Sequence, residues 1–121
     1  VVGRLGGEEF AVLVRGHSLQ QLRDLADEQR VKFAAKRLKC KTQWQQFSAS
    51  FGIAILGDGE DINDLLARAD DALYLAKQSG RNCVKDEADL NMRKLGEVQR
   101  YGYKHASAGN DEHGLRTAKA G

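Results

Sequence analysis

The chain has 121 residues, with 19 Lys and Arg against 17 Asp and Glu and a formal net charge of +2. This length suits one domain with a core of moderate size. A sequence pI near 8.6 is too mild to indicate a nucleic-acid-binding surface, which would need clustered cations. Cys40 and Cys83 show no metal-binding spacing, and we interpret them as reduced thiols.

No apolar run approaches the ~20 residues that a membrane-spanning helix needs, and no signal peptide is recognisable. The composition therefore favours a soluble, cytoplasmic segment. The first residue is Val1 rather than Met, and strand-like sequence starts at once. We accordingly expect a piece of a longer protein, whose upstream part could carry a membrane anchor.

The first unit reads as a β-hairpin, with strands over 1–5 and 10–14 around the pair Gly6-Gly7. The second strand is apolar on both faces, which is typical of a strand that is covered on both sides and hence central in its sheet. A helix is expected next, from the N-cap Ser18 to about Lys39. Cations at its end complement the helix dipole, an interpretation we prefer to ligand binding. They are Lys36, Arg37, Lys39 and Lys41.

The clearest strand covers 47–55, where bulky residues alternate with Ser48, Ser50, Gly52 and Ala54. Its small face predicts that a helix or a ligand approaches closely on that side. Asp61 then caps a helix over about 62–79, and Gly80 ends it. The apolar stripe of this helix has the best periodicity in the chain: Ile62, Leu65, Leu66, Ala69, Ala72, Leu73 and Ala76.

A last short strand is expected around 82–85. From Asp86 onward the chain is polar, and we expect a helix over 87–101 followed by disorder. The chain thus divides into a folded part, 1–85, and a polar extension, 86–121. No internal repeat is present.

Two segments could carry chemistry. Gly6 and Gly7 allow close approach to a bulky anionic ligand, and Glu8 and Glu9 could hold a divalent metal of the kind that accompanies nucleotide phosphates. Taken alone, however, these residues fit an ordinary solvated turn equally well.

A polar stripe on the helix at 62–79 is the second segment. It runs through Asp70, Tyr74 and Lys77 to Arg81, just past the helix end. The two cations suit nucleotide phosphates, Lys as a point charge and Arg as a fork. They also fit a dipole-complementing helix terminus, which locally is the simpler interpretation.

Three blocks together resemble the GGDEF family of diguanylate cyclases, in the family's order and at ordinary separations. The resemblance covers about residues 1–85, and Arg4-Leu5 precede the glycines as the family usually has it. The pentapeptide alone is a weak signal, whereas the combination is very specific. The blocks are GGEEF at 6–10, SFGIA at 50–54 and ADDALYLAKQSGRN at 69–82.

The resemblance implies an α/β (α+β) fold, the ferredoxin-like palm of nucleotidyl cyclases, with an antiparallel-containing central sheet flanked by helices. It implies condensation of two GTP into cyclic di-GMP and pyrophosphate on Mg²⁺ or Mn²⁺, by two copies of the domain facing each other. By similarity, Gly6 and Gly7 lie beneath the GTP phosphates, and Lys77 and Arg81 bind them. Glu8 looks like a metal ligand and the candidate base for the ribose 3′-hydroxyl.

Glu9 is similarly assigned to the same metal site, with a less defined role. The family's other metal-binding Asp and its guanine ligands belong to a first strand and helix that this sequence lacks. Its RxxD product-inhibition motif would end just before Val1. We therefore expect residues 1–85 to be the C-terminal two-thirds of such a domain, and the isolated chain to be inactive. The alternative is a non-catalytic module that binds GTP or cyclic di-GMP.

Overall fold

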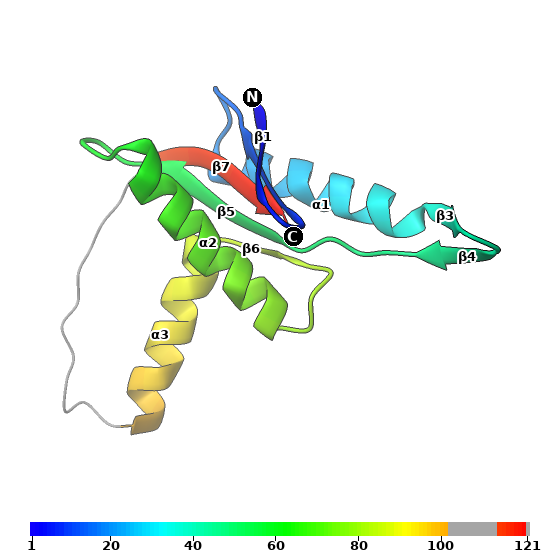
Figure 1. Ribbon diagram of the computed structural model, residues 1–121. Helices are drawn as coiled ribbons and strands as arrows, with labels where there is room; N and C mark the ends of the chain where they lie inside the picture. The colour runs from blue at the N-terminus through cyan, green and yellow to red at the C-terminus, as the bar shows by residue number, and fades with distance from the viewer. Residues whose placement is uncertain (102–113, 121) are drawn as a thin grey trace.

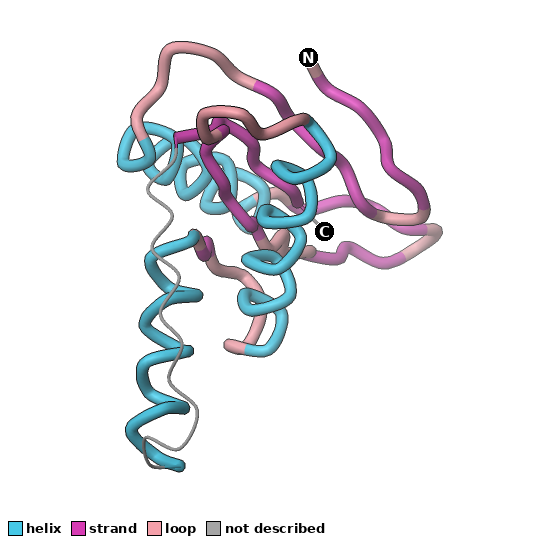
Figure 2. The backbone as a smooth tube through the Cα atoms, turned by 90° about the vertical axis from the view of Figure 1, so that its left-hand side faces the viewer, coloured by secondary structure: helices cyan, strands magenta, loops and turns pink. Residues whose placement is uncertain are grey.

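The computed structural model describes residues 1–101 and 114–120, and every structural statement below concerns these residues. They form a mixed sheet with helices on both of its faces, together with a small separate hairpin (Figure 1, Figure 2). The mixed α/β class expected from the sequence is confirmed. The elements are β1 (Val2–Gly6), β2 (Glu9–Leu13), α1 (Leu19–Ala35), β3 (Arg37–Cys40), β4 (Gln43–Gln46), β5 (Phe51–Leu56), α2 (Ile62–Gln78), β6 (Val84–Lys85), α3 (Glu87–Tyr101) and β7 (Gly114–Ala120).

The larger sheet has the strand order β1-β2-β7-β5-β6. β5 and β6 are parallel, and the other neighbours are antiparallel. β2 has a partner on each side, as its apolar sequence predicted. The expected coverage on both faces is wrong, because Phe10 remains 45% exposed.

The end of α1 differs from the expectation. The helix stops at Ala35 rather than near Lys39, because Lys36 takes an extended conformation with φ −76° and ψ 135°. The chain continues into the hairpin β3–β4. Lys36 remains at the C-cap of the helix, but Arg37, Lys39 and Lys41 lie in this hairpin, so for these three the interpretation as a dipole-matched helix terminus is wrong. The next strand, expected over 47–55, begins only at Phe51.

The prediction for the segment after Asp86 is the second one that the structure corrects. α3 spans the expected range, but residues 114–120, for which we expected disorder, form strand β7. β7 lies between β2 and β5, with Ala120 in register with both Phe10 and Phe51. The backbone N–H and C=O groups along the facing edges of β2 and β5 need partners, and β7 supplies them to both. The rest of the expected disordered stretch, 102–113 and 121, lies outside the described residues.

The closest packing in the core is between β5 and α2. A Cβ atom placed on Gly52 would lie 2.2 Å from the carbonyl oxygen of Ala69 and 2.2 Å from the backbone nitrogen of Leu73. The expected close approach of a helix to the small face of this strand is thus confirmed. On the opposite face of β5, Ile53 packs with Leu22 and Ala26 of α1.

Both ends of α2 are capped as the sequence predicted. The side chain of Asp61 accepts hydrogen bonds from the N–H groups of Asn63 and Asp64, at 2.7 and 3.0 Å. At the other end Gly80 has φ 105°, and the N–H of Arg81 donates to the carbonyl of Ala76 at 3.0 Å. This last bond is the Schellman arrangement that closes a helix with a left-handed glycine.

Ion pairs hold the start of α3 against the domain. Arg23 of α1 lies 2.5 Å from Asp86 and 2.9 Å from Asp89. Burial alone would raise the pKa of Asp89, but the hydrogen bond from the N–H of Asp86 and the nearby guanidinium of Arg23 outweigh burial and lower it. Arg68 of α2 joins Glu60 and Glu87 in a second cluster.

We predict that Gly52→Ala lowers the free energy of unfolding by about 3 kcal/mol, because the added methyl group meets helix backbone that cannot rotate away. Urea denaturation followed by circular dichroism measures this. Gly3→Ala is the matched control, since no atom lies within 4 Å of the added Cβ. Equal stability of the two variants would contradict the close contact.

We also predict a pH-dependent contribution from Asp89. Its folded pKa is lowered, so the contribution is complete above the unfolded value of 3.8 and is lost as the pH falls through the folded value. Asp89→Asn should therefore lower the melting temperature at pH 7, and the difference from wild type should shrink below about pH 4. Asp58→Asn, in an exposed turn, is the control. A difference that does not change with pH would count against this assignment.

Candidate active site at the hairpin tip

The tip of the β1–β2 hairpin is built on two glycines. Gly6 has φ 137° and Gly7 has φ 54°, both outside the range that side-chain-bearing residues commonly adopt. Gly6 is in register with Glu9, so the turn is tight. Backbone without side chains is thereby presented at the end of a strand pair, where a bulky anion can approach it closely.

Arg4 fixes this turn, a role that the sequence did not reveal. Its Nε and Nη2 donate to the carbonyl oxygen of Gly7, at 3.0 and 2.7 Å. Because the peptide bond is planar and trans, holding that oxygen directs the N–H of Glu8 to the opposite side. Arg4 thus sets the orientation of the residue assigned to catalysis. The signal available in the sequence was the position of Arg4, two residues before the diglycine. From there its side chain could fold back onto the turn.

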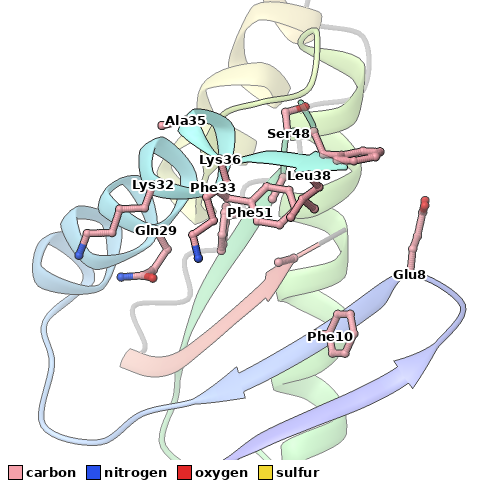
Figure 3. A pocket seen from close by; sticks show the side chains of 13 residues that line it. Glu8, Phe10, Gln29, Lys32, Phe33, Ala35, Lys36, Leu38, Ser48 and Phe51 are labelled. Atoms are coloured by element: carbon pink, nitrogen blue, oxygen red, sulfur yellow. The ribbon is translucent and has the colours of Figure 1, made fainter. Parts of the chain in front are cut away.

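The structure separates the two glutamates of the tip. Glu9 lies on the α2 side of the hairpin, where Lys77 Nζ is 3.3 Å from its Oε1. Glu8 lies on the α1 side, where it lines a hollow together with Phe10 (Figure 3). The adjacent carboxylates therefore do not form one cluster. Among the described residues, no group of three acidic, His or Cys side chains is placed to hold a metal ion.

The hollow beside Glu8 is mainly apolar and has a volume of about 860 Å³. Phe33 at the end of α1 and Phe51 at the start of β5 form much of its wall (Figure 3). Lys32 and Lys36 also line it, and Lys32 is paired with Glu28 at 2.5 Å. The site thus combines an acidic tip, an apolar wall and a few cations.

The end of α2 faces the tip from the other side. Lys77 stands in its last turn and reaches Glu9, whereas Arg81 is exposed just beyond the Gly80 cap. Arg81 has φ 63° and Asn82 has φ 46°, an unusual left-handed pair. Ser50 steadies this bend by accepting the N–H of Asn82 at 3.1 Å. The bend explains why a polar serine is buried at the start of the SFGIA block.

The tip offers donors suited to magnesium or manganese. Carboxylate oxygens are their preferred protein ligands, and Mg²⁺ is commonly held by one or two carboxylates together with substrate phosphates. Glu8 fits this description as it stands. Glu9 fits it once Lys77 has moved to another partner. The residues present therefore match a metal that arrives with a polyphosphate rather than one held in a closed protein cage.

Comparison with known proteins places the chain in a family. The family model for "Diguanylate cyclase, GGDEF domain" matches residues 1–83. The chain therefore belongs to the GGDEF family, whose mixed α/β fold the structure shares. No helix within 1–101 has the length and apolar character required to cross a membrane.

Several curated relatives share this region. Diguanylate cyclase DgcM of Escherichia coli is 39% identical over 84 residues, covering 69% of this chain and 20% of that protein. The bifunctional diguanylate cyclase/cyclic di-GMP phosphodiesterase MucR of Pseudomonas aeruginosa is 38% identical over 82 residues, covering 67% of this chain and 12% of that protein. Diguanylate cyclase VdcA of Vibrio cholerae is 37% identical over 84 residues, covering 67% of this chain and 25% of that protein. The chain therefore spans a quarter or less of these relatives.

We predict that Arg4→Ala loosens the turn without unfolding the sheet. The NMR order parameters of the Gly7 and Glu8 amides should fall from rigid values near 0.85 to below about 0.6, because the Gly7 carbonyl loses both donors. Arg4→Lys should give intermediate values, since an ammonium lacks the planar fork. Arg15→Ala, which removes an exposed arginine just beyond the end of β2, is the control. An unchanged turn in Arg4→Ala would refute this role.

Proposed function

We propose that this domain belongs to a diguanylate cyclase, which condenses two GTP into cyclic di-GMP with release of pyrophosphate. The contact between Lys77 and Glu9, at 3.3 Å, carries the proposal. It joins the two motifs that are 68 residues apart in sequence and assembles a glycine turn, a carboxylate and a cation at one place. Attack on an α-phosphate needs positioning and charge neutralisation more than covalent help from the protein, and these are the groups that supply them.

Each residue then has a distinct task. The Gly6-Gly7 turn supports the phosphates, and Lys77 and Arg81 neutralise them as a point charge and a fork. Glu8 accepts the proton of the attacking ribose 3′-hydroxyl. Glu8 and Glu9, on opposite sides of the hairpin, would each offer carboxylate oxygens to a metal ion. Mg²⁺ or Mn²⁺, when bound, stabilises the charge that develops on the phosphates. Because each domain holds one GTP, two copies must face each other, so a homodimer is part of the mechanism.

A non-catalytic module that binds GTP or cyclic di-GMP is the second candidate. One observation favours it for the isolated chain: Glu8 and Glu9 lie on opposite sides of the hairpin, and among the described residues no group of three acidic, His or Cys side chains is placed to hold a metal ion. We therefore propose that the 121-residue chain alone binds nucleotide but does not turn it over. Cyclic di-GMP production by this chain with GTP and Mg²⁺ would show the opposite.

The enzyme proposal is tested in the longest natural protein that carries this domain. Glu8→Ala should reduce cyclic di-GMP synthesis at least about 100-fold, as expected when a general base is lost, while GTP affinity changes little. Chromatographic product analysis and equilibrium binding measure the two quantities. Glu97→Ala, on the exposed side of α3, is the control. Synthesis that survives Glu8→Ala removes Glu8 from the catalytic role, and synthesis absent from the wild type favours the binding module.

A further inference from the structure

The basic cluster of the sequence lies in a part of the fold that the proposed reaction does not use. Lys36 caps α1, and Arg37, Lys39 and Lys41 follow within the β3–β4 hairpin. None of the four forms an ion pair with another described residue. The sequence has no Asp or Glu at all from 29 to 57. Positive charge is therefore concentrated at this hairpin without acidic residues beside it in the chain.

The hairpin projects beyond the end of α1, away from the five-stranded sheet (Figure 1). All four residues of each strand are exposed, and the two strands contact chiefly each other. A turn that includes Lys41, with φ 58°, lies between them. A segment that packs so little against its own domain is available for contacts outside it.

Exposed apolar side chains accompany the cations. Trp44 is 64% exposed and Leu38 is 47% exposed. Lys39 is in register with Trp44, so their side chains share one face of the hairpin, whereas Leu38 points to the other face. Tryptophan beside lysine and arginine is typical of protein surfaces that lie in the headgroup layer of a bilayer.

We propose that the β3–β4 hairpin docks the domain on the surface of a bilayer that contains anionic lipids. The four cations attract the lipid headgroups. The indole of Trp44 enters the interfacial layer, where its ring meets apolar groups and its N–H meets polar ones. The outer edges of β3 and β4 have no strand partners among the described residues, so the hairpin stays in the hydrated layer and does not enter the hydrocarbon.

The shape of the hairpin favours a lipid surface over a nucleic acid. Proteins that bind single strands use a positively charged groove lined with aromatic side chains. Here Lys39 and Trp44 stand on a narrow projection, and Leu38 lies on its opposite face. A headgroup layer surrounds an inserted tip, so both faces gain contacts. A nucleic-acid strand on one face would leave the apolar side chain of the other face in water.

The single tryptophan of the chain makes the test direct, because the fluorescence of Trp44 reports on the hairpin alone. The full 121-residue chain is titrated with vesicles of equal parts phosphatidylglycerol and phosphatidylcholine, and with vesicles of phosphatidylcholine alone. Four cations imply a molar partition coefficient on the order of 10³ M⁻¹, so lipid must reach millimolar concentrations. We expect a shift of the emission to shorter wavelength and weaker acrylamide quenching with the anionic vesicles only. Added salt should reverse both.

Variants then locate the contact. Lys39→Gln should weaken binding to the anionic vesicles about fivefold, and the double variant Lys39→Gln/Lys41→Gln about twentyfold or more. Lys94→Gln removes the same charge from exposed α3 and should change binding less than about twofold. Trp44→Ala, followed by vesicle sedimentation because the fluorophore is lost, should also weaken binding. Thermal unfolding confirms that each variant is folded.

Three results overturn the proposal. One is equal binding, or none, to the two kinds of vesicle. Another is a loss in Lys94→Gln as large as that in Lys39→Gln, because net charge alone would then explain binding. The third is a change in Trp44 emission with a single-stranded oligoribonucleotide or with inorganic phosphate but not with the anionic vesicles. The hairpin would then bind a nucleic acid or a free anion.

Discussion

The contact between Gly52 and the backbone of α2 is the constraint on which the candidate site depends. A helix can lie this close to a strand only where the strand has no side chain, since a Cβ on Gly52 would be 2.2 Å from two backbone atoms of α2. The small residues of α2 that face the core, such as Ala69 and Ala72, complete the fit. The position of the helix is thereby fixed relative to β5. β5 is in turn joined through β7 to β2 and the hairpin tip.

This arrangement explains why Lys77 meets Glu9 and not Glu8. Successive residues of a strand point to opposite faces of a sheet. Glu9, at the start of β2, turns toward α2, whereas Phe10 turns toward α1. Glu8 stands in the turn, where Arg4 sets its backbone. Two neighbouring carboxylates thus obtain different surroundings, one paired with a cation and the other beside an apolar wall.

Much of the scaffold could be predicted from local patterns. The caps of α2, its apolar stripe and the small face of β5 are encoded in short stretches, because hydrogen bonding at helix ends and side-chain periodicity act over only a few residues. The hairpin β3–β4 was missed because each of its strands has only four residues, and the one at 43–46 contains a single apolar residue, Trp44. β7 was missed for a different reason. The sequence of β7 carries no strong strand pattern. Its position depends on pairing with β2 and β5, which both lie more than fifty residues earlier in the chain.

By itself, the sequence determined the glycine turn, the extent of helix α2 and the membership of a family whose motifs occur in a fixed order. These are properties of residue type and spacing, which need no knowledge of distant contacts. Only the tertiary structure decided that Arg4 holds the turn, that Glu8 and Glu9 diverge and that Lys77 neutralises one of them. Such facts depend on where separate segments meet, and the close approach that Gly52 permits decides where they meet here.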